Sequence, residues 1–273
     1  MGSSLTDSAT DNAQAVADAF VAARRSATVL ARYPGERPVT LADAYRIQDR
    51  AIAIDGREVI GWKVGKINPP TDAALGACRL VGPIFREAVK MAKPGEFPSM
   101  PVFDGGFAAA EAEMLLHVAP GWNGIVPEND EGTRAILDDV RMGIEIASSP
   151  YPGINADGPT VTVSDFGNNA GVVIGEPIAG WQTADLCAIL VRTRIEGEAV
   201  GETTAATMLD GPFGAVRFLL ANLAARGIDG SRGLWVSTGA ITGVHLAAIG
   251  QEVTAEFDGH GAVHCRIVAA RAA

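Results

Sequence analysis

The stretch FAAAEAEMLLHV, residues 107–118, says most about the fold and about the chemistry. Every second residue in it is apolar: Ala110, Ala112, Met114, Leu116 and Val118. Successive side chains of a β-strand point to opposite faces, so this alternation predicts a strand with one buried face. Glu111 and Glu113 then share the other face.

Two carboxylates on one strand face repel each other unless water surrounds them or a cation neutralises them. A solvent-facing strand is one interpretation of the pair, because charged side chains are mostly exposed. A bound Mg²⁺ or Mn²⁺ is the other, because these cations prefer carboxylate oxygen. Glu145 adds a third carboxylate between Gly143 and Ala147, small residues that leave room for a ligand. A structural salt bridge is the alternative for Glu145.

Lys63 is the candidate basic residue. In the predicted strand at 59–66 it shares a face with Gly61 and Gly65, which let a ligand or another backbone approach its ammonium. A lysine with hindered solvation can take part in acid–base chemistry or hold an anion. A surface lysine that extends its head into water is the alternative.

Composition excludes several classes of protein. The 273 residues carry 22 Lys+Arg against 32 Asp+Glu, a net charge of −10, which argues against nucleic-acid binding. No apolar run reaches the roughly 18 residues of a membrane span, and the polar N-terminal segment predicts no signal peptide. We therefore expect a cytoplasmic protein. The 32 glycines predict many turns and close backbone contacts.

The predicted secondary structure changes near residue 58, from helices to short strands. Before it, helices are expected at 13–31 and after Thr40, which can cap the second one. After it, short strands with glycines between them are expected at 59–66, 107–118, 142–147, 172–174, 186–195, 252–257 and 263–268, with helices at 133–140 and 213–226. The absence of regular strand–helix alternation favours a mixed or antiparallel β core. We predict a helical N-terminal region at 1–58 and a second domain at 59–273.

Known nucleotide and hydrolase motifs are missing from the sequence. No glycine-rich loop follows a strand as GxGxxG or GxxxxGK[ST], and no GxSxG elbow is present. The three cysteines and four histidines show no metal-binding or redox spacing.

Several motifs together resemble one enzyme family. They are GWKVG (61–65), VGPI (81–84), EAE (111–113), GIEI (143–146), GNNAGVVIG (167–175), DGP (210–212) and STGAIT (237–242). Their order is similar to that in the 2-keto-4-pentenoate hydratases and 4-oxalocrotonate decarboxylases of the fumarylacetoacetate hydrolase superfamily. The resemblance extends over roughly residues 40–268. It implies an α+β fold with a mixed β-roll or sandwich core after a small helical N-terminal region.

The resemblance also implies a site. It assigns a divalent cation, Mg²⁺ or Mn²⁺, to Glu111, Glu113 and Glu145, and catalytic roles to Lys63 and Asp165. Substrate contacts are implied for Gly65, Thr238 and Gly239. In such enzymes the cation chelates the 1-carboxylate and 2-oxygen of a 2-oxo or 2-hydroxydienoate acid and stabilises the enolate.

The implied activity is that of a metal-dependent lyase. We expect a hydratase that adds water to a 2-hydroxy-2,4-dienoate to give a 4-hydroxy-2-oxo acid in aromatic catabolism. A 4-oxalocrotonate-type decarboxylase, an acylpyruvate hydrolase and a non-catalytic relative that binds a keto acid are the alternatives. The resemblance further implies a homo-oligomer that can associate with another enzyme of the pathway.

Three positions depart from the family pattern. Pro150 stands where relatives often carry arginine, Asp165-Phe166 replaces an Asp-Asn pair, and Ala108-Ala109 replaces a proline and a basic residue. The predicted metal ligands are intact, so these changes concern the groups around them.

Overall fold

A computed structural model describes residues 3–272, with side chains from residue 11 onward. The described helices are α1 (Ser3–Ser26), α2 (Leu41–Asp55), α3 (Thr71–Leu75), α4 (Asp130–Ala135), α5 (Pro159–Ser164) and α6 (Gly211–Arg226). The described strands are β1 (Val59–Lys66), β2 (Arg79–Phe85), β3 (Val89–Met91), β4 (Ser99–Val102), β5 (Phe107–Val118), β6 (Leu137–Ser149), β7 (Asn169–Pro177), β8 (Leu190–Ile195), β9 (Glu198–Thr204), β10 (Leu234–Ser237), β11 (His245–Leu246), β12 (Glu252–Phe257) and β13 (Gly261–Ala269).

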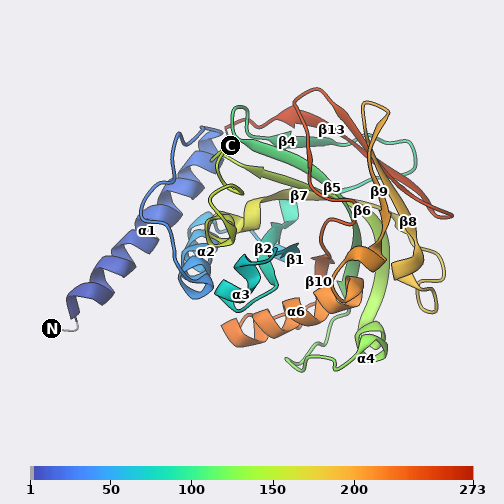
Figure 1. The fold of residues 1–273 in the computed structure, drawn as a ribbon, viewed down its shortest axis with the longest axis horizontal. Coiled ribbons are helices and arrows are strands. Elements are labelled where there is room, and N and C mark those ends of the chain that lie inside the picture. Colours follow the sequence, from blue (N-terminus) through green and yellow to red (C-terminus); the bar gives the residue numbers. More distant parts are fainter. Residues whose placement is uncertain (1–2, 273) are drawn as a thin grey trace.

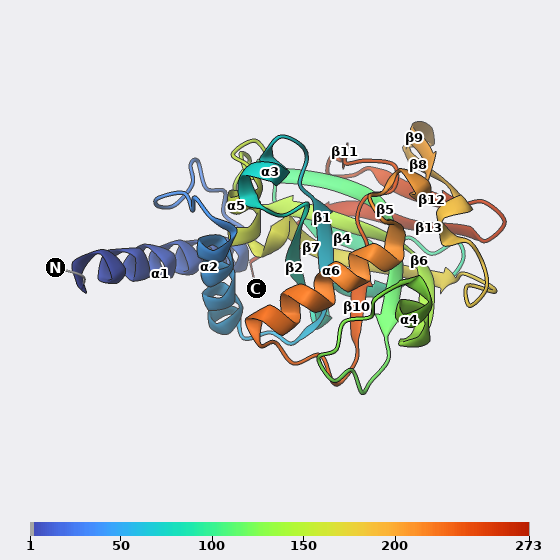
Figure 2. The same ribbon diagram turned by 60° about the horizontal axis from the view of Figure 1, so that its bottom comes forward.

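The described strands form two sheets. The larger has the order β2-β1-β10-β5-β6-β7-β3, with β11 paired to β5, and the smaller has the order β4-β13-β12-β8-β9. Both sheets contain parallel and antiparallel pairs. Helix α1 extends away from the sheets at one end of the molecule, and α6 runs alongside β1 and β10 (Figures 1 and 2). The α+β prediction, with a mixed β core after a small helical region, is confirmed.

The helix signals in the N-terminal region act as the sequence predicts. The Thr40 side chain accepts a hydrogen bond from the Asp43 N–H at 3.1 Å, and Gly56 ends α2 in the left-handed conformation with φ of 72°. Helix α1 ends at Ser26 rather than near Ala31, because Ala27 turns the chain with φ of 51°. The division at residue 58 stays a prediction.

Several predicted elements have different bounds, and the strands expected at 142–147 and 172–174 are the longer β6 and β7. The helix expected at 133–140 is α4, which begins earlier because the Asn129 side chain accepts the Gly132 N–H at 2.9 Å. It also ends earlier, because β6 pairs with β5 from Leu137 onward. The strand expected at 186–195 begins only at Leu190, after a short turn of 3₁₀ helix.

Strand β5 is buried on both faces. Ala112, Met114 and Leu116 belong to the main core, which contains side chains from both sheets and from α6. On the opposite face, Leu115 packs in a smaller cluster with Ile84, Val172 and Ile174. The solvent-facing interpretation of this strand is therefore wrong. Among the described helices, none is both long and apolar enough to cross a bilayer.

Gly82 in β2 lies in close contact with the backbone of Phe166. A Cβ atom added at Gly82 would lie 2.0 Å from the Phe166 carbonyl oxygen, which is backbone and cannot rotate away. We expect Gly82→Ala to lower the free energy of unfolding by roughly 1–3 kcal/mol, as overpacking does. Urea unfolding measures the change.

Gly132→Ala in α4 is the matched control, because a Cβ there meets its nearest atom at 3.4 Å and alanine favours helix. Equal stability of the Gly82→Ala variant and the wild type would contradict this packing.

Candidate metal and active site

The three candidate carboxylates meet on adjacent strands. Glu111 on β5 lies directly opposite Glu145 on β6, and Glu113 follows two residues further along the same face of β5. One oxygen from each carboxylate lies within 4.8 Å of the others. The three residues are 5%, 0% and 0% exposed. The structure thus brings together the trio predicted from the sequence, in a buried position.

Each of the two deeper carboxylates has one oxygen that accepts hydrogen bonds and one oxygen that accepts none. Glu113 Oε2 accepts hydrogen bonds from Ser237 Oγ at 2.5 Å and from the Gly239 N–H at 2.8 Å. Glu145 Oε1 accepts from Asn169 Nδ2 at 2.8 Å. Glu113 Oε1 and Glu145 Oε2 are buried without a hydrogen-bond partner among the described residues. Burying a carboxylate oxygen without a hydrogen bond raises the free energy of the folded state unless a cation binds it.

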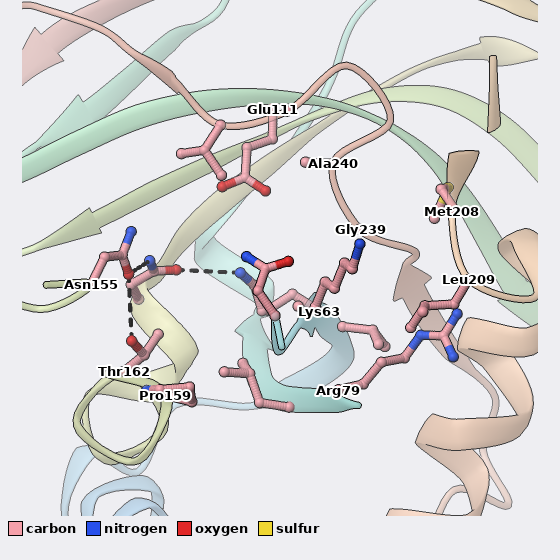
Figure 3. Close-up of a pocket in the computed structure, with 18 of the residues that line it drawn as sticks. Lys63, Arg79, Glu111, Asn155, Pro159, Thr162, Met208, Leu209, Gly239 and Ala240 are labelled. Carbon is pink, nitrogen blue, oxygen red and sulfur yellow. Dashed lines mark hydrogen bonds between the residues drawn. The ribbon is translucent and has the colours of Figure 1, made fainter. Parts of the chain in front are cut away.

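Lys63 lies beside the trio and is itself buried (Figure 3). Its Nζ is 3.3 Å from Glu145 Oε2, an ion pair without hydrogen-bond geometry, and it donates to Asn168 Oδ1 at 3.3 Å. Burial lowers the pKa of the Lys63 ammonium, but Glu145, Glu111 and Glu113 outweigh that effect and raise it overall. Lys63 is therefore a cation, and the surface-lysine alternative is wrong.

The charges of this cluster do not balance. Burial raises the pKa of Glu111 to about 7, against the opposing effect of Lys63, and burial with the two neighbouring carboxylates raises the pKa of Glu113 well above its usual value. With all three ionised, three negative charges face one ammonium and leave a charge of −2. A hard divalent cation would supply the missing charge and would bind the free oxygens. The donor set therefore fits Mg²⁺ or Mn²⁺.

A cavity of about 800 Å³ opens beside the trio (Figure 3). Five of the predicted site residues line it: Lys63, Gly65, Glu111, Thr238 and Gly239. Glu113 and Glu145 lie deeper, outside the lining. The Thr238 hydroxyl donates to the Met114 carbonyl at 2.9 Å, so its substrate contact stays a prediction.

Asp165 lies behind the site rather than in the cavity wall. It is fully buried, accepts a hydrogen bond from Ser149 Oγ at 2.6 Å and pairs with Arg24 at 2.5 Å. The catalytic role predicted for Asp165 stays a prediction.

Two of the glycines make room for protein atoms instead of a ligand. A Cβ at Gly143 would lie 2.5 Å from the Leu115 side chain, so the expected ligand space beside Glu145 is filled. A Cβ at Gly61 would lie 2.5 Å from the Trp235 carbonyl oxygen, which is the close approach of strand β10. Gly65 does face the cavity, with its missing Cβ 3.8 Å from Lys63 Nζ.

Sequence reasoning missed the residues that hold the trio and line the rest of the cavity. They are Arg79, Asn155, Asn168, Asn169 and Ser237. Arg24, which binds Asp165 behind the site, was missed as well. Asn168, Asn169 and Ser237 lie inside two of the recognised motifs, so the polar residues at the start of GNNAGVVIG and STGAIT could have indicated them.

Two curated proteins are similar to this chain over most of its length. No protein-family model matches the chain. The chain is 27% identical over 248 residues to a 4-oxalocrotonate decarboxylase of Pseudomonas putida, covering 84% of this chain and 86% of that protein. A 4-oxalocrotonate decarboxylase of Pseudomonas sp. strain CF600 is 26% identical over 242 residues, with the same coverage of both proteins.

Solved structures show the same fold. The 4-oxalocrotonate decarboxylase of Pseudomonas putida G7, complexed with magnesium and adipate, superposes with a TM-score of 0.78 at 22% identity, covering 95% of this chain and 98% of that one. The fumarylpyruvate hydrolase of Pseudomonas aeruginosa, in complex with Mn²⁺ and pyruvate, gives 0.54 at 16% identity, covering 77% and 90%. These relatives and structures support the resemblance of the chain to the fumarylacetoacetate hydrolase superfamily. Both of these solved structures contain a divalent metal, magnesium in the first and Mn²⁺ in the second.

Replacing a candidate ligand should stabilise the metal-free protein. The pKa of Glu111 is raised in the folded state, so the ionised carboxylate destabilises the fold increasingly as pH rises from about 4.5 to about 7. Glu111→Gln removes this cost. We expect a gain on the order of 2–3 kcal/mol at pH 8 and almost none at pH 4.5, measured by urea unfolding in a chelator.

Saturating Mn²⁺ should reverse the order of stability. The wild type gains stability from the cation and Glu111→Gln gains much less, because binding to the native state stabilises it by mass action. Equal unfolding curves for both proteins at every pH, with and without Mn²⁺, would contradict the assignment of Glu111.

Proposed function

We propose that this chain is a divalent-metal-dependent decarboxylase that acts on a 2-oxo diacid of the 4-oxalocrotonate type. The buried trio, which together with Lys63 carries a charge of −2 when ionised and which borders a cavity, carries the proposal. The names of the two sequence relatives favour decarboxylation over the hydration expected from the sequence. Hydration of a 2-hydroxydienoate remains a prediction that the same assay tests.

The residues around the cavity suit this reaction. A bound cation would supply Lewis-acid chemistry, polarising the 2-oxo acid end of the substrate. Glu111, Glu113 and Glu145 would hold that cation. Lys63 keeps its proton on Nζ and places a positive charge beside this cation site. As the C5–C6 bond breaks and carbon dioxide leaves, the electron pair passes to the 2-oxygen of the substrate, and this positive charge would stabilise the resulting enolate.

Two further cations in the cavity wall suit a second carboxylate. Arg79 is buried, lines the cavity, and pairs through its Nη2 with Asp210 at 2.5 Å. Lys66 lines the same cavity without an ion-pair partner among the described side chains. In Figure 3, Arg79 and Glu111 lie on different walls, with Lys63 between them. This arrangement favours a diacid, with one end near the trio and the other near Arg79.

A direct assay separates the two activities. Protein stripped of metal and resupplied with Mg²⁺ or Mn²⁺ is mixed with 4-oxalocrotonate or with 2-hydroxypenta-2,4-dienoate. We expect release of carbon dioxide from the diacid only when the cation is present. Loss of the dienoate absorbance without carbon dioxide would instead establish a hydratase. Turnover of the diacid in a chelator would contradict the metal-dependent proposal.

Arg79→Met should raise KM for the diacid. A hydrogen bond to a charged group contributes about 1.5–3 kcal/mol, so the expected increase is roughly 10- to 100-fold. The effect should be a higher KM without a fall in kcat, because the second carboxylate loses its charge as carbon dioxide leaves, so that Arg79 binds the ground state at least as tightly as the transition state. Steady-state kinetics measures both.

Arg217→Met is the matched control. Arg217 also contacts Asp210, at 3.7 Å, but it does not line the cavity. An unchanged KM in Arg79→Met, or an equal increase in both variants, would remove the proposed contact with the second carboxylate.

A further inference from the structure

One arginine of the N-terminal helix reaches the back of the site. Arg24 lies in the last turn of α1, and its side chain is only 8% exposed. Its guanidinium lies 5.5 Å from the centre of the Phe103 ring and 5.1 Å from that of Phe166. Nε and Nη2 donate to the two oxygens of Asp165 at 2.5 and 3.0 Å, a bidentate fork. A buried guanidinium needs such acceptors.

The same guanidinium binds both ends of a strained turn. Arg24 Nη2 donates to the Asp165 carbonyl at 3.3 Å, and Nη1 donates to the Asn169 carbonyl at 3.1 Å. The three residues between these carbonyls have φ of 55°, 62° and 57°: Phe166, Gly167 and Asn168. The left-handed conformation costs roughly 1–2 kcal/mol for a residue with a side chain. The turn therefore depends on contacts that hold its ends.

This turn presents two amide side chains to the site. Asn168 Oδ1 accepts from Lys63 Nζ at 3.3 Å, and Asn169 Nδ2 donates to Glu145 Oε1 at 2.8 Å. Asn168 is also fixed from its other side, because its Nδ2 donates to Asn155 Oδ1 at 2.9 Å (Figure 3). The positions of the two amide groups that orient Lys63 and Glu145 therefore depend on the conformation of the turn.

The turn has little freedom to shift without moving the site. The Phe166 carbonyl packs against the Cα of Gly82, where a Cβ would be 2.0 Å away. A Cβ at Gly167 would lie 3.3 Å from Lys63 Cδ. A displacement of the turn would therefore change the contacts along the Lys63 side chain as well as those at its end.

We propose that Arg24 is a positioning residue whose fork to Asp165 fixes the 165–169 turn, and with it the geometry of Lys63 and Glu145. Asp165 then acts through the turn and not by touching the substrate. Helix α1 thus helps to fix the geometry of the site although none of its residues lines the cavity. The activity arm of the test rests on the proposed function, whereas the metal-binding arm does not.

The neighbouring arginine provides a matched control. Arg25 donates to the Ile54 and Asp55 carbonyls at 2.8 and 3.1 Å, so it fastens α1 to the end of α2 and makes no contact with the turn. Loss of a helix anchor alone would affect Arg24→Ala and Arg25→Ala through stability. Loss of site geometry would affect only Arg24→Ala at temperatures where both variants are folded.

The experiment compares the wild type, Arg24→Ala and Arg25→Ala. Calorimetric titration with Mn²⁺ gives the metal affinity, and kinetics with the diacid gives kcat and KM. We expect Arg24→Ala to lose about 10- to 100-fold in Mn²⁺ affinity or kcat, as residues that orient metal ligands typically do. Millimolar methylguanidinium, which can occupy the vacated space, should restore part of the loss, and methylammonium should not. Arg25→Ala should resemble the wild type.

Arg24→Lys keeps the charge without the fork and should remain deficient. It carries the test if Arg24→Ala does not fold. Wild-type Mn²⁺ affinity and kcat in both Arg24 variants would overturn the proposal, as would an equal loss in Arg25→Ala or methylguanidinium rescue no better than that by methylammonium. A wild type that binds Mn²⁺ but leaves the diacid unchanged would refute the proposed function alone.

Discussion

The structure depends on placing three carboxylates in its interior opposite a single ammonium. Glu111, Glu113 and Glu145 are at most 5% exposed, and Lys63 is the one cation in ion-pair contact with them among the described side chains. Burial of unbalanced charge is unfavourable, so the cluster must either take up protons or bind a cation. In the metal-free protein the pKa values of Glu111 and Glu113 are raised, because burial disfavours their ionised forms.

The candidate metal ligands lie on paired strands rather than on flexible loops. The ligands lie on the long β5–β6 pair, where cross-strand register fixes Glu111 against Glu145. Donors from two other segments then bind one oxygen each on Glu113 and Glu145 and leave the second oxygen of each without a hydrogen bond. Carboxylates held in this way need little rearrangement to bind a cation, which is what a preorganised site requires.

The sequence predicted the parts of this site that depend on local alternation. Glu111 and Glu113 share a face because they are two residues apart on one strand, and the apolar residues between and beyond them identify that strand. Arg24 and Ser237 could not be found this way, because they reach the site across 141 and 124 residues of sequence. Gly143 was misread because its missing side chain makes room for Leu115, a contact that periodicity cannot show.

Crystals grown with Mn²⁺ give the most direct test of the central claim, because the anomalous signal of manganese locates the ion without assumption about the reaction. The account predicts one strong anomalous peak within about 2–2.5 Å of an oxygen from each of Glu111, Glu113 and Glu145. Absence of a peak there at saturating Mn²⁺, with the carboxylates hydrogen-bonded to one another instead, would contradict it.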